Sequence, residues 1–155
     1  MNKTTAHKQG LYARLYNQLV PLLADSPSVN SQMATINAIV YHKLSYSFWT
    51  GFYTIKEKQL IVGPYQGPLA CQILEYPHGA CWQSIIQEKS LIIPDVSLFP
   101  DHIACDSRSK SEIVIPVRDK KKQITGVFDM DSNQLKAFDS TDLEGLEKIL
   151  ELLKL

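Results

Sequence analysis

Two apolar segments joined by a charged turn decide the fold. The segments are Glu112-Ile-Val-Ile-Pro-Val117 and Ile124-Thr-Gly-Val-Phe-Asp-Met-Asp131, and the turn between them contains Arg118-Asp-Lys-Lys-Lys122. Both apolar segments are rich in β-branched residues, which favour strands. The connection between them is short and charged, as expected of a turn at the end of a hairpin. We therefore predict two strands here, with an antiparallel arrangement favoured by the short connection.

The predicted hairpin carries acidic side chains on the face that points away from the core. Successive side chains of a strand point to opposite faces, so Phe128 and Met130 are expected on the core face and Asp129 and Asp131 on the other. Glu112 likewise projects opposite to the apolar residues of its strand. If the strands are neighbours, three carboxylates meet in one patch. A solvated sheet face is the simpler interpretation, but acids that repel one another need a reason, such as a cationic ligand or a raised pKa.

The segments around this hairpin predict an α+β fold. The expected elements are helices over 6–24, 31–44, 79–89 and 140–155 and further strands over 46–55, 60–65 and 91–93. Short connections favour an antiparallel sheet with helices packed on one face. Residues 94–110 show no periodicity, and structureless loops longer than about 12–15 residues are usually functional. We expect a ligand pocket under this loop on the other face.

Length and composition exclude several classes of protein. A chain of 155 residues fits one domain, here residues 1–155, with N-terminal helices (about 6–44), a sheet with its site loops (about 46–132) and a C-terminal helix (about 140–155). Sixteen basic residues balance sixteen acidic ones, so nothing favours nucleic-acid binding or polybasic membrane anchoring. We find no apolar run of about 18 residues for a membrane helix and no signal peptide, and we expect a cytoplasmic protein.

Three cysteines, Cys71, Cys81 and Cys105, lie 10 and 24 residues apart. This spacing lacks the short cysteine pair of finger and ribbon zinc sites, so no metal is predicted, although a site that also uses His78 or His102 stays open. Three unrelated buried thiols are the simplest alternative. Each cysteine, however, is predicted in a loop or at a helix start, where sulfurs can approach and separate as thiol–disulfide exchange requires.

An aromatic strand supplies a second feature. Trp49, Gly51 and Tyr53 share one face, and Phe48 and Phe52 are expected on the opposite, core face. Core packing is the default interpretation of aromatic residues in a strand. Gly51 between two large rings leaves room for a close approach to the backbone. We therefore predict a small apolar pocket here.

Seven short motifs carry a resemblance that covers nearly the whole chain: Trp49-Thr-Gly-Phe-Tyr53, Gly63-Pro-Tyr-Gln-Gly67 with Ala70-Cys71, Gly79-Ala-Cys81, Pro94-Asp-Val96, His102-Ile-Ala-Cys-Asp-Ser107, Ser111-Glu-Ile-Val114 and Asp129-Met-Asp-Ser132. In their order, and in the cysteine separations, they resemble the free methionine-(R)-sulfoxide reductases, a group within the GAF-domain fold. The resemblance implies that free L-methionine-(R)-sulfoxide is reduced to L-methionine by thiol chemistry, without a cofactor. A non-catalytic GAF sensor that binds an amino-acid-like ligand is the alternative.

The resemblance also implies roles for the cysteines and the aromatic pair. Cys105 would be the nucleophile that becomes a sulfenic acid. Cys71 would be the resolving thiol that closes an intramolecular disulfide, and Cys81 a secondary resolver or a relay. Trp49 and Tyr53 would hold the methyl group of the substrate.

The acidic patch and the partners follow from the same resemblance. Glu112, Asp129 and Asp131 would bind the ammonium group of the free amino acid and protonate the sulfoxide oxygen, with the division of these roles open. Thioredoxin or a similar dithiol reductant would reopen the disulfide. A homodimer is compatible with the resemblance, since sensor-type GAF domains often pair through terminal helices.

Overall fold

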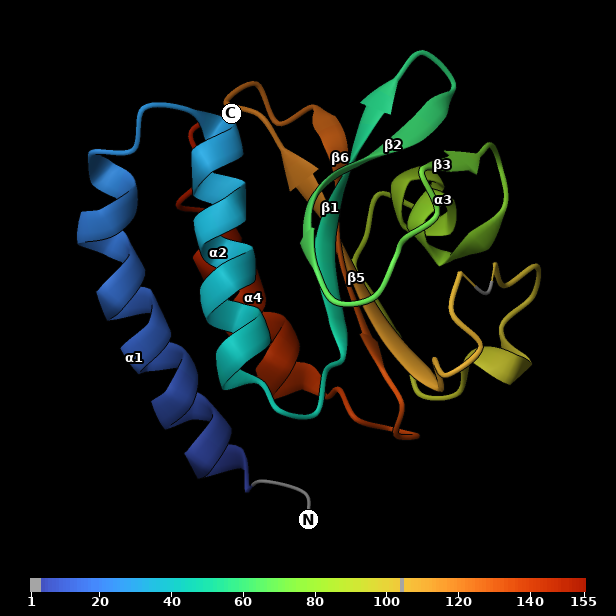
Figure 1. The fold of residues 1–155 in the computed structure, drawn as a ribbon, viewed down its shortest axis with the longest axis horizontal. Helices are drawn as coiled ribbons and strands as arrows, with labels where there is room; N and C mark the ends of the chain where they lie inside the picture. Colours follow the sequence, from blue (N-terminus) through green and yellow to red (C-terminus); the bar gives the residue numbers. More distant parts are fainter. Residues whose placement is uncertain (1–3, 104) are drawn as a thin grey trace.

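The computed structural model describes residues 4–103 and 105–155 and is built around one six-stranded sheet (Figure 1). Ala104, within the motif around Cys105, lies outside the described residues. The sheet has the order β3-β2-β1-β6-β5-β4, and each neighbouring pair is antiparallel. The strands are β1 (Trp49–Lys56), β2 (Gln59–Gln66), β3 (Ile73–Glu75), β4 (Leu91–Ile93), β5 (Ser111–Arg118) and β6 (Ile124–Ser132).

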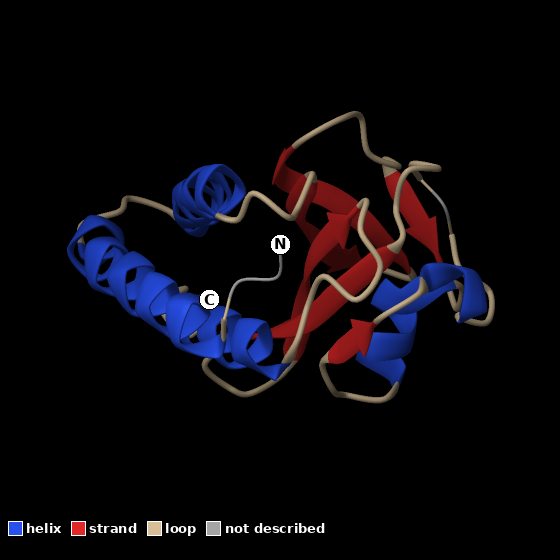
Figure 2. Cartoon of the chain, turned by 90° about the horizontal axis from the view of Figure 1, so that it is seen from below, coloured by secondary structure: helices blue, strands red, loops and turns tan. Residues whose placement is uncertain are grey.

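Helices divide unequally between the two faces of the sheet. One side carries α1 (Thr5–Ala24), α2 (Val29–Lys43) and α4 (Ser140–Leu150), while α3 (Gly79–Ile86) and the short 3-10 helix η1 (Val96–Leu98) lie on the other (Figures 1 and 2). The predicted α+β fold with an antiparallel sheet is confirmed, and α1, α2 and α4 pack on one face as expected, whereas α3 and η1 lie on the other face, where the pocket was expected. No helix in the described part of the chain is long and apolar enough to cross a membrane.

The larger core lies between the sheet and the three long helices. Phe128 and Met130 of β6 and Ile113 of β5 are fully buried in it, as the alternation of side chains predicted. The ring of Phe52 packs against that of Phe128, with their centroids 4.9 Å apart. This face therefore has an ordinary close-packed apolar interior.

Charged and hydroxyl groups fasten α1 to α4 on the same side. Lys8 is only 4% exposed and pairs with Asp139 and Asp142. The hydroxyl groups of Tyr12 and Tyr46 donate to Asp142 Oδ1. Asp139 caps α4 in a capping box with Asp142, so one cluster both starts the helix and holds its neighbour.

A second, smaller core lies on the opposite face, between the sheet and α3. Trp82 Nε1 donates to the backbone oxygen of Leu74 over 2.8 Å, which ties α3 to β3. Cys81 precedes Trp82 in the helix and is 4% exposed. The predicted helix over 79–89 and strand over 91–93 are therefore present, although the helix ends at Ile86.

Several element boundaries differ from those predicted. Strand β1 begins at Trp49 rather than at 46, because Ser47 closes a turn there: its hydroxyl donates to the oxygens of Trp49 and Asp131. Strand β3, with only three residues, was not predicted. The closing helix ends at Leu150, five residues before the expected end.

Candidate active site

Strand register brings the acidic and aromatic residues together on the face opposite the long helices. Within the β5–β6 and β1–β6 pairs, Asp131 lies between Glu112 and Trp49. In the next row, Asp129 lies between Val114 and Gly51. The strands predicted as neighbours are therefore paired, and the patch of three carboxylates exists because these residues fall on one side of β5 and β6.

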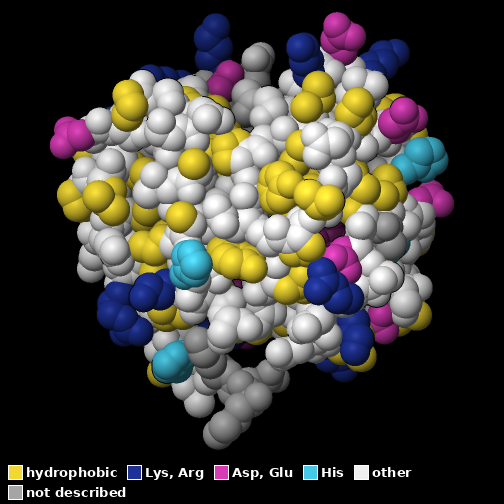
Figure 3. Space-filling view, in the orientation of Figure 1, with side chains coloured by type: hydrophobic (Ala, Val, Ile, Leu, Met, Phe, Trp, Pro, Cys, Tyr) yellow, Lys and Arg dark blue, Asp and Glu magenta, His cyan; other side chains and the backbone are white. Residues whose placement is uncertain are grey.

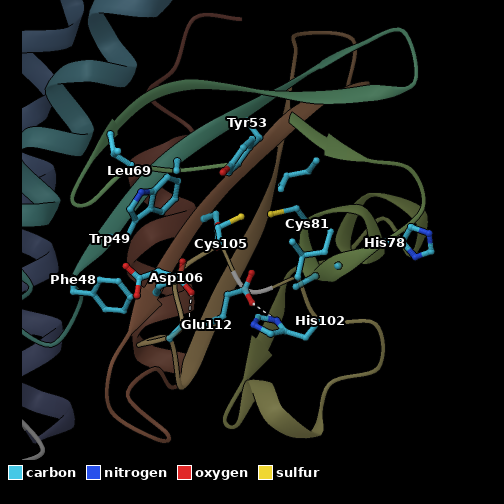
Figure 4. Close-up of a pocket in the computed structure, with 18 residues that line it drawn as sticks. Phe48, Trp49, Tyr53, Leu69, His78, Cys81, His102, Cys105, Asp106 and Glu112 are labelled. Carbon is cyan, nitrogen blue, oxygen red and sulfur yellow. Dashed lines mark hydrogen bonds and ion pairs between the residues drawn. The ribbon is translucent and has the colours of Figure 1, made fainter. Parts of the chain in front are cut away.

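This face forms a pocket that is open to solvent at its mouth. Loops that precede α3 and β5 close over the sheet to form its walls (Figure 4). In the orientation of Figure 1, hydrophobic side chains are spread over both halves of the surface, with a cluster right of centre (Figure 3). The lining residues are Phe48, Trp49, Tyr53, Leu69, Ala70, Leu74, His78, Gly79, Ala80, Cys81, His102, Ile103, Cys105, Asp106, Ser109, Glu112, Asp129 and Asp131.

The three carboxyl groups are held in an environment that disfavours their charged forms. Glu112 and Asp129 are 5% and 6% exposed, and burial, followed by the neighbouring acids, raises the pKa of each well above its usual value. Burial also raises the pKa of Asp131 to about 6, against the opposing effect of a hydrogen bond from the Ser109 hydroxyl. Near neutral pH this cluster can hold a proton, so it can both bind a cation and donate a proton.

Aromatic rings form the wall beside the carboxylates. Trp49 stacks with Tyr53 at 5.9 Å between ring centroids and with Tyr65 at 5.6 Å. The room left by Gly51 is taken by the indole itself: a Cβ at this position would lie 2.5 Å from Trp49. The aromatic pocket is therefore present, but Gly51 serves the packing of its wall rather than the approach of a ligand.

Phe48 contradicts the expected alternation of the aromatic strand. It lies before the first residue of β1 and lines the pocket instead of the helix-side core. Its backbone nitrogen donates to the oxygen of Asp131, and the Arg108 guanidinium lies 5.2 Å from its ring centroid. The period of two applies only within a strand, and Phe48 is outside it.

The cysteines divide into a bonded pair and a buried free thiol. Cys71 and Cys105 form a disulfide with Cα atoms 5.5 Å apart. Cys105 is exposed and lines the pocket, while Cys71 is half-buried and its backbone oxygen accepts the Tyr53 hydroxyl over 3.1 Å. Cys81 remains a thiol, and burial, assisted by Asp129, raises its pKa well above the usual value.

Two residues that could activate Cys105 as cations, His102 and Arg108, have other partners or are held neutral. His102 Nδ1 lies 3.8 Å from Glu112 Oε2, and burial lowers the pKa of His102, which favours the neutral imidazole. Arg108 donates two hydrogen bonds to the Asp106 carboxylate, of 2.9 and 2.7 Å. Activation of Cys105 by either cation therefore has no support in this geometry.

Similar proteins match nearly the whole chain. It is 36% identical over 154 residues to the free methionine-R-sulfoxide reductase of Escherichia coli, with 99% of this chain and 90% of that protein covered. The structure of the Neisseria meningitidis enzyme of the same name, in complex with its substrate, superposes with a TM-score of 0.90 at 34% identity, covering 95% of this chain and 88% of that one. The chain belongs to the free methionine-R-sulfoxide reductase family.

Other comparisons agree with this family assignment. The GAF domain-containing protein A of Dictyostelium discoideum is 42% identical over 147 residues, with 94% of this chain and 92% of that protein covered. No protein-family model matches the chain. The family and the GAF fold expected from the sequence motifs are both confirmed.

Some residues of this reductase-type site were missed by the sequence analysis. Ser109, which donates to Asp131, lies at the end of the loop that was predicted to be functional, but nothing marked it within that loop. Ile103 and Leu74 line the apolar side of the pocket. Their positions depend on how the loops fold back over the sheet, which local patterns do not reveal.

Proposed function

We propose that this protein reduces free L-methionine-(R)-sulfoxide to L-methionine. The observation that carries the proposal is the position of Cys105 on the wall of a pocket that also contains three raised-pKa carboxyl groups, with Cys71 already within bonding distance. A thiol, a proton donor and a resolving thiol are the parts that sulfoxide reduction needs. Membership of the reductase family supports the same assignment.

The first chemical step takes place at Cys105. Its sulfur attacks the sulfoxide sulfur while a protonated carboxyl group of the cluster gives its proton to the sulfoxide oxygen. The attack forms a transient bond between the two sulfur atoms. The protonated oxygen then passes from the methionine sulfur to Cys105, the S–S and S–O bonds to methionine break, methionine leaves, and Cys105 remains as a sulfenic acid. Two electrons pass from the thiol to the substrate, so the reaction needs no redox cofactor.

The second step removes the oxygen from the enzyme. The Cys71 thiol attacks the sulfenic acid, water leaves, and the Cys71–Cys105 disulfide forms, which is the bond present here. An external dithiol then reopens it by exchange. We assign this task to thioredoxin or a similar reductant in the cytoplasm, where the thiols can be kept reduced.

Substrate orientation follows from the two walls of the pocket. Trp49 and Tyr53 would contact the methyl group on the sulfur. Carboxylates among Glu112, Asp129 and Asp131 would pair with the α-ammonium group, a charge that a methionine inside a peptide lacks. The same cluster therefore explains both protonation and the restriction to a free amino acid.

The decisive experiment compares free and N-acetylated methionine-(R)-sulfoxide at equal concentration with excess dithiol. Leaving a buried charge without its partner commonly costs about 2–5 kcal/mol, so the acetylated compound should react at least about 30-fold more slowly. Methionine release is measured by chromatography, and free thiols are titrated after substrate is removed from reduced protein. A reductase loses two thiols in this assay, whereas a ligand-binding sensor would lose none. Equal rates for the two compounds would contradict the ammonium-binding role.

A further inference from the structure

A set of metal-binding donors lies on the pocket floor around the free thiol. Cys81 Sγ, a carboxylate oxygen of Glu112 and a carboxylate oxygen of Asp129 all lie within 4.8 Å of one another. The three residues are 4%, 5% and 6% exposed. They come from three elements, α3, β5 and β6, so the juxtaposition is a product of the fold and not of sequence spacing.

Several of these polar atoms lack a hydrogen-bond partner among the described residues. Glu112 Oε2 and Asp129 Oδ1 are buried and accept no hydrogen bond from a nitrogen or hydroxyl donor of the described residues. Nε2 of the adjacent His102 is also buried and has no hydrogen-bond partner among the described residues. Among the described residues, no lysine or arginine forms an ion pair with these two carboxylates. Buried carboxyl oxygens in this state favour a bound cation.

We propose that Cys81, Glu112 and Asp129 bind a thiophilic divalent cation such as zinc. Since the same carboxylates are assigned to the substrate ammonium, zinc excludes the substrate and acts as an inhibitor; this second half rests on the proposed function. The cation is therefore a regulator of the pocket and has no part in sulfoxide reduction.

The donor types select the ion. Zinc accepts thiolate sulfur at about 2.3 Å and carboxylate oxygen at about 2.0–2.2 Å, usually in a tetrahedron. Ligand atoms of such a tetrahedron are roughly 3.5 Å apart, so the side-chain ends would move together by up to about 1.3 Å. His102 Nδ1 lies 3.8 Å from Glu112 Oε2 but is not among the donor atoms that all lie within 4.8 Å of one another, so it is not counted as a ligand. Magnesium and calcium prefer all-oxygen sites and should bind poorly.

Zinc binding releases protons from the site. The Cys81 thiol gives up its proton to form the thiolate ligand, and any proton held by the two carboxyl groups is released to solvent. No electron moves, and the Cys71–Cys105 bond is not touched. The disulfide form of the protein therefore keeps the complete donor set.

The test uses this disulfide form, in which Cys81 is the remaining thiol among the three cysteines. Zinc is titrated against a chromophoric chelator, without any methionine sulfoxide. One zinc per chain is expected. Because even the loss of an outer-shell partner commonly weakens metal sites 10–100-fold, Cys81→Ala and Glu112→Gln should each weaken zinc binding at least about tenfold. Asp101→Asn, an exposed acid of the same loop as His102, is the matched control and should change nothing.

Further measurements keep the outcome interpretable. If Cys81→Ala fails to fold, Cys81→Ser takes its place, because serine is nearly the same size as cysteine. Circular dichroism checks that each variant is folded. Cobalt bound to the native protein should show a thiolate charge-transfer band that Cys81→Ser lacks. Failure of the native protein to bind zinc, or unchanged affinity in both Cys81 variants, would overturn the metal site.

A last titration separates this inference from the proposed function. Added methionine-(R)-sulfoxide should raise the apparent zinc dissociation constant. If zinc binds but the sulfoxide has no effect on it, exclusion of the substrate is wrong. Methionine formation by the reduced, zinc-free protein is assayed in parallel. Activity without zinc binding would leave the reductase function standing and remove the metal site alone.

Discussion

The two faces of the central sheet are built from the same strands but differ in how their buried residues are paired. On the helix side, Phe128 and Met130 are fully buried in a continuous apolar core, and the buried charge of Lys8 is paired. On the pocket side, Asp129 lies between these two residues in sequence and is nearly as buried, yet one of its oxygens lacks a donor among the described residues. One face is organised for stability, while the other keeps groups whose interactions are completed by a ligand.

Neighbouring residues of β6 show what this difference teaches. A strand delivers side chains alternately to both faces, so a residue that stabilises the fold and one that opposes it can be adjacent. Burying carboxylates side by side costs free energy of folding, and the apolar face offsets this cost. Burial alone therefore does not tell which residues support the fold, whereas the presence of partners does.

The largest expected effect is on the chemistry of the pocket face. In Cys105→Ser, a hydroxyl that is not ionised near neutral pH replaces the proposed nucleophile. We expect methionine formation to fall at least about 1,000-fold, even in a single turnover. The reduced protein should keep its thermal stability, because Cys105 is exposed. Cys71→Ser is the control: it should give one equivalent of methionine and then stop, and a full burst from Cys105→Ser would refute the assignment.

Paired substitutions at adjacent positions of β6 test the contrast between the faces directly. Phe128→Ala leaves a cavity in the helix-side core and should destabilise the protein by about 3–5 kcal/mol. Asp129→Asn removes a buried carboxylate from a repelling group and should keep or raise the free energy of unfolding, while turnover falls about 100-fold through loss of an acid–base group. Urea unfolding and methionine release are measured on both. A strongly destabilised Asp129→Asn would mean that the carboxylate has a structural partner.

Stability should also depend on pH through the pocket face. Burial raises the pKa of Asp131 from 3.8 to about 6, so folding favours its neutral form. Its stabilising contribution is complete below pH 3.8 and is lost as pH rises through about 6. Between pH 4.5 and 7 the native protein should therefore lose about 1–2 kcal/mol more of unfolding free energy than Asp131→Asn. The comparison with the variant cancels His102, whose lowered pKa acts in the opposite direction; identical pH profiles would contradict the prediction.

Sequence patterns predicted the parts of the molecule that depend on local periodicity. The opposite orientations of Asp129 and Met130, and the convergence of Glu112 with the aspartates, follow from strand alternation and one correct pairing. Phe48 was assigned wrongly because the alternation begins only at Trp49. Ser109 was missed because a loop has no period that fixes where each side chain points.

The remaining differences between prediction and structure come from contacts between residues far apart in the sequence. Strand β3 has three residues and exists because it pairs with β2 and lies next to α3 through the Trp82 hydrogen bond. Its own sequence, Ile73-Leu-Glu75, is too short to signal a strand. The contact of Cys81 with Asp129 likewise joins elements almost fifty residues apart, and no spacing rule contains it.

The smallest expected effect concerns the ion pair at the rim of the pocket. Arg108 and Asp106 are joined by two hydrogen bonds, but Arg108 is exposed, and such pairs contribute little to stability in water. The guanidinium is engaged by Asp106 and lies over Phe48, so it does not face Cys105 as an activating charge. Arg108→Ala should therefore leave the unfolding free energy unchanged and alter methionine formation by no more than about twofold.

Lys8→Ala is the contrasting variant on the helix side. It removes the partner of the fully buried Asp142, a change that commonly costs about 3–5 kcal/mol. Both variants lose one cation, but Arg108 pairs with one carboxylate at the surface, whereas Lys8 pairs with two and is itself buried. Thermal unfolding and the pH dependence of single-turnover methionine formation are measured for the two. A shift of the alkaline limb in Arg108→Ala would show that this cation does tune Cys105, and the pocket face would then contain a paired charge of its own.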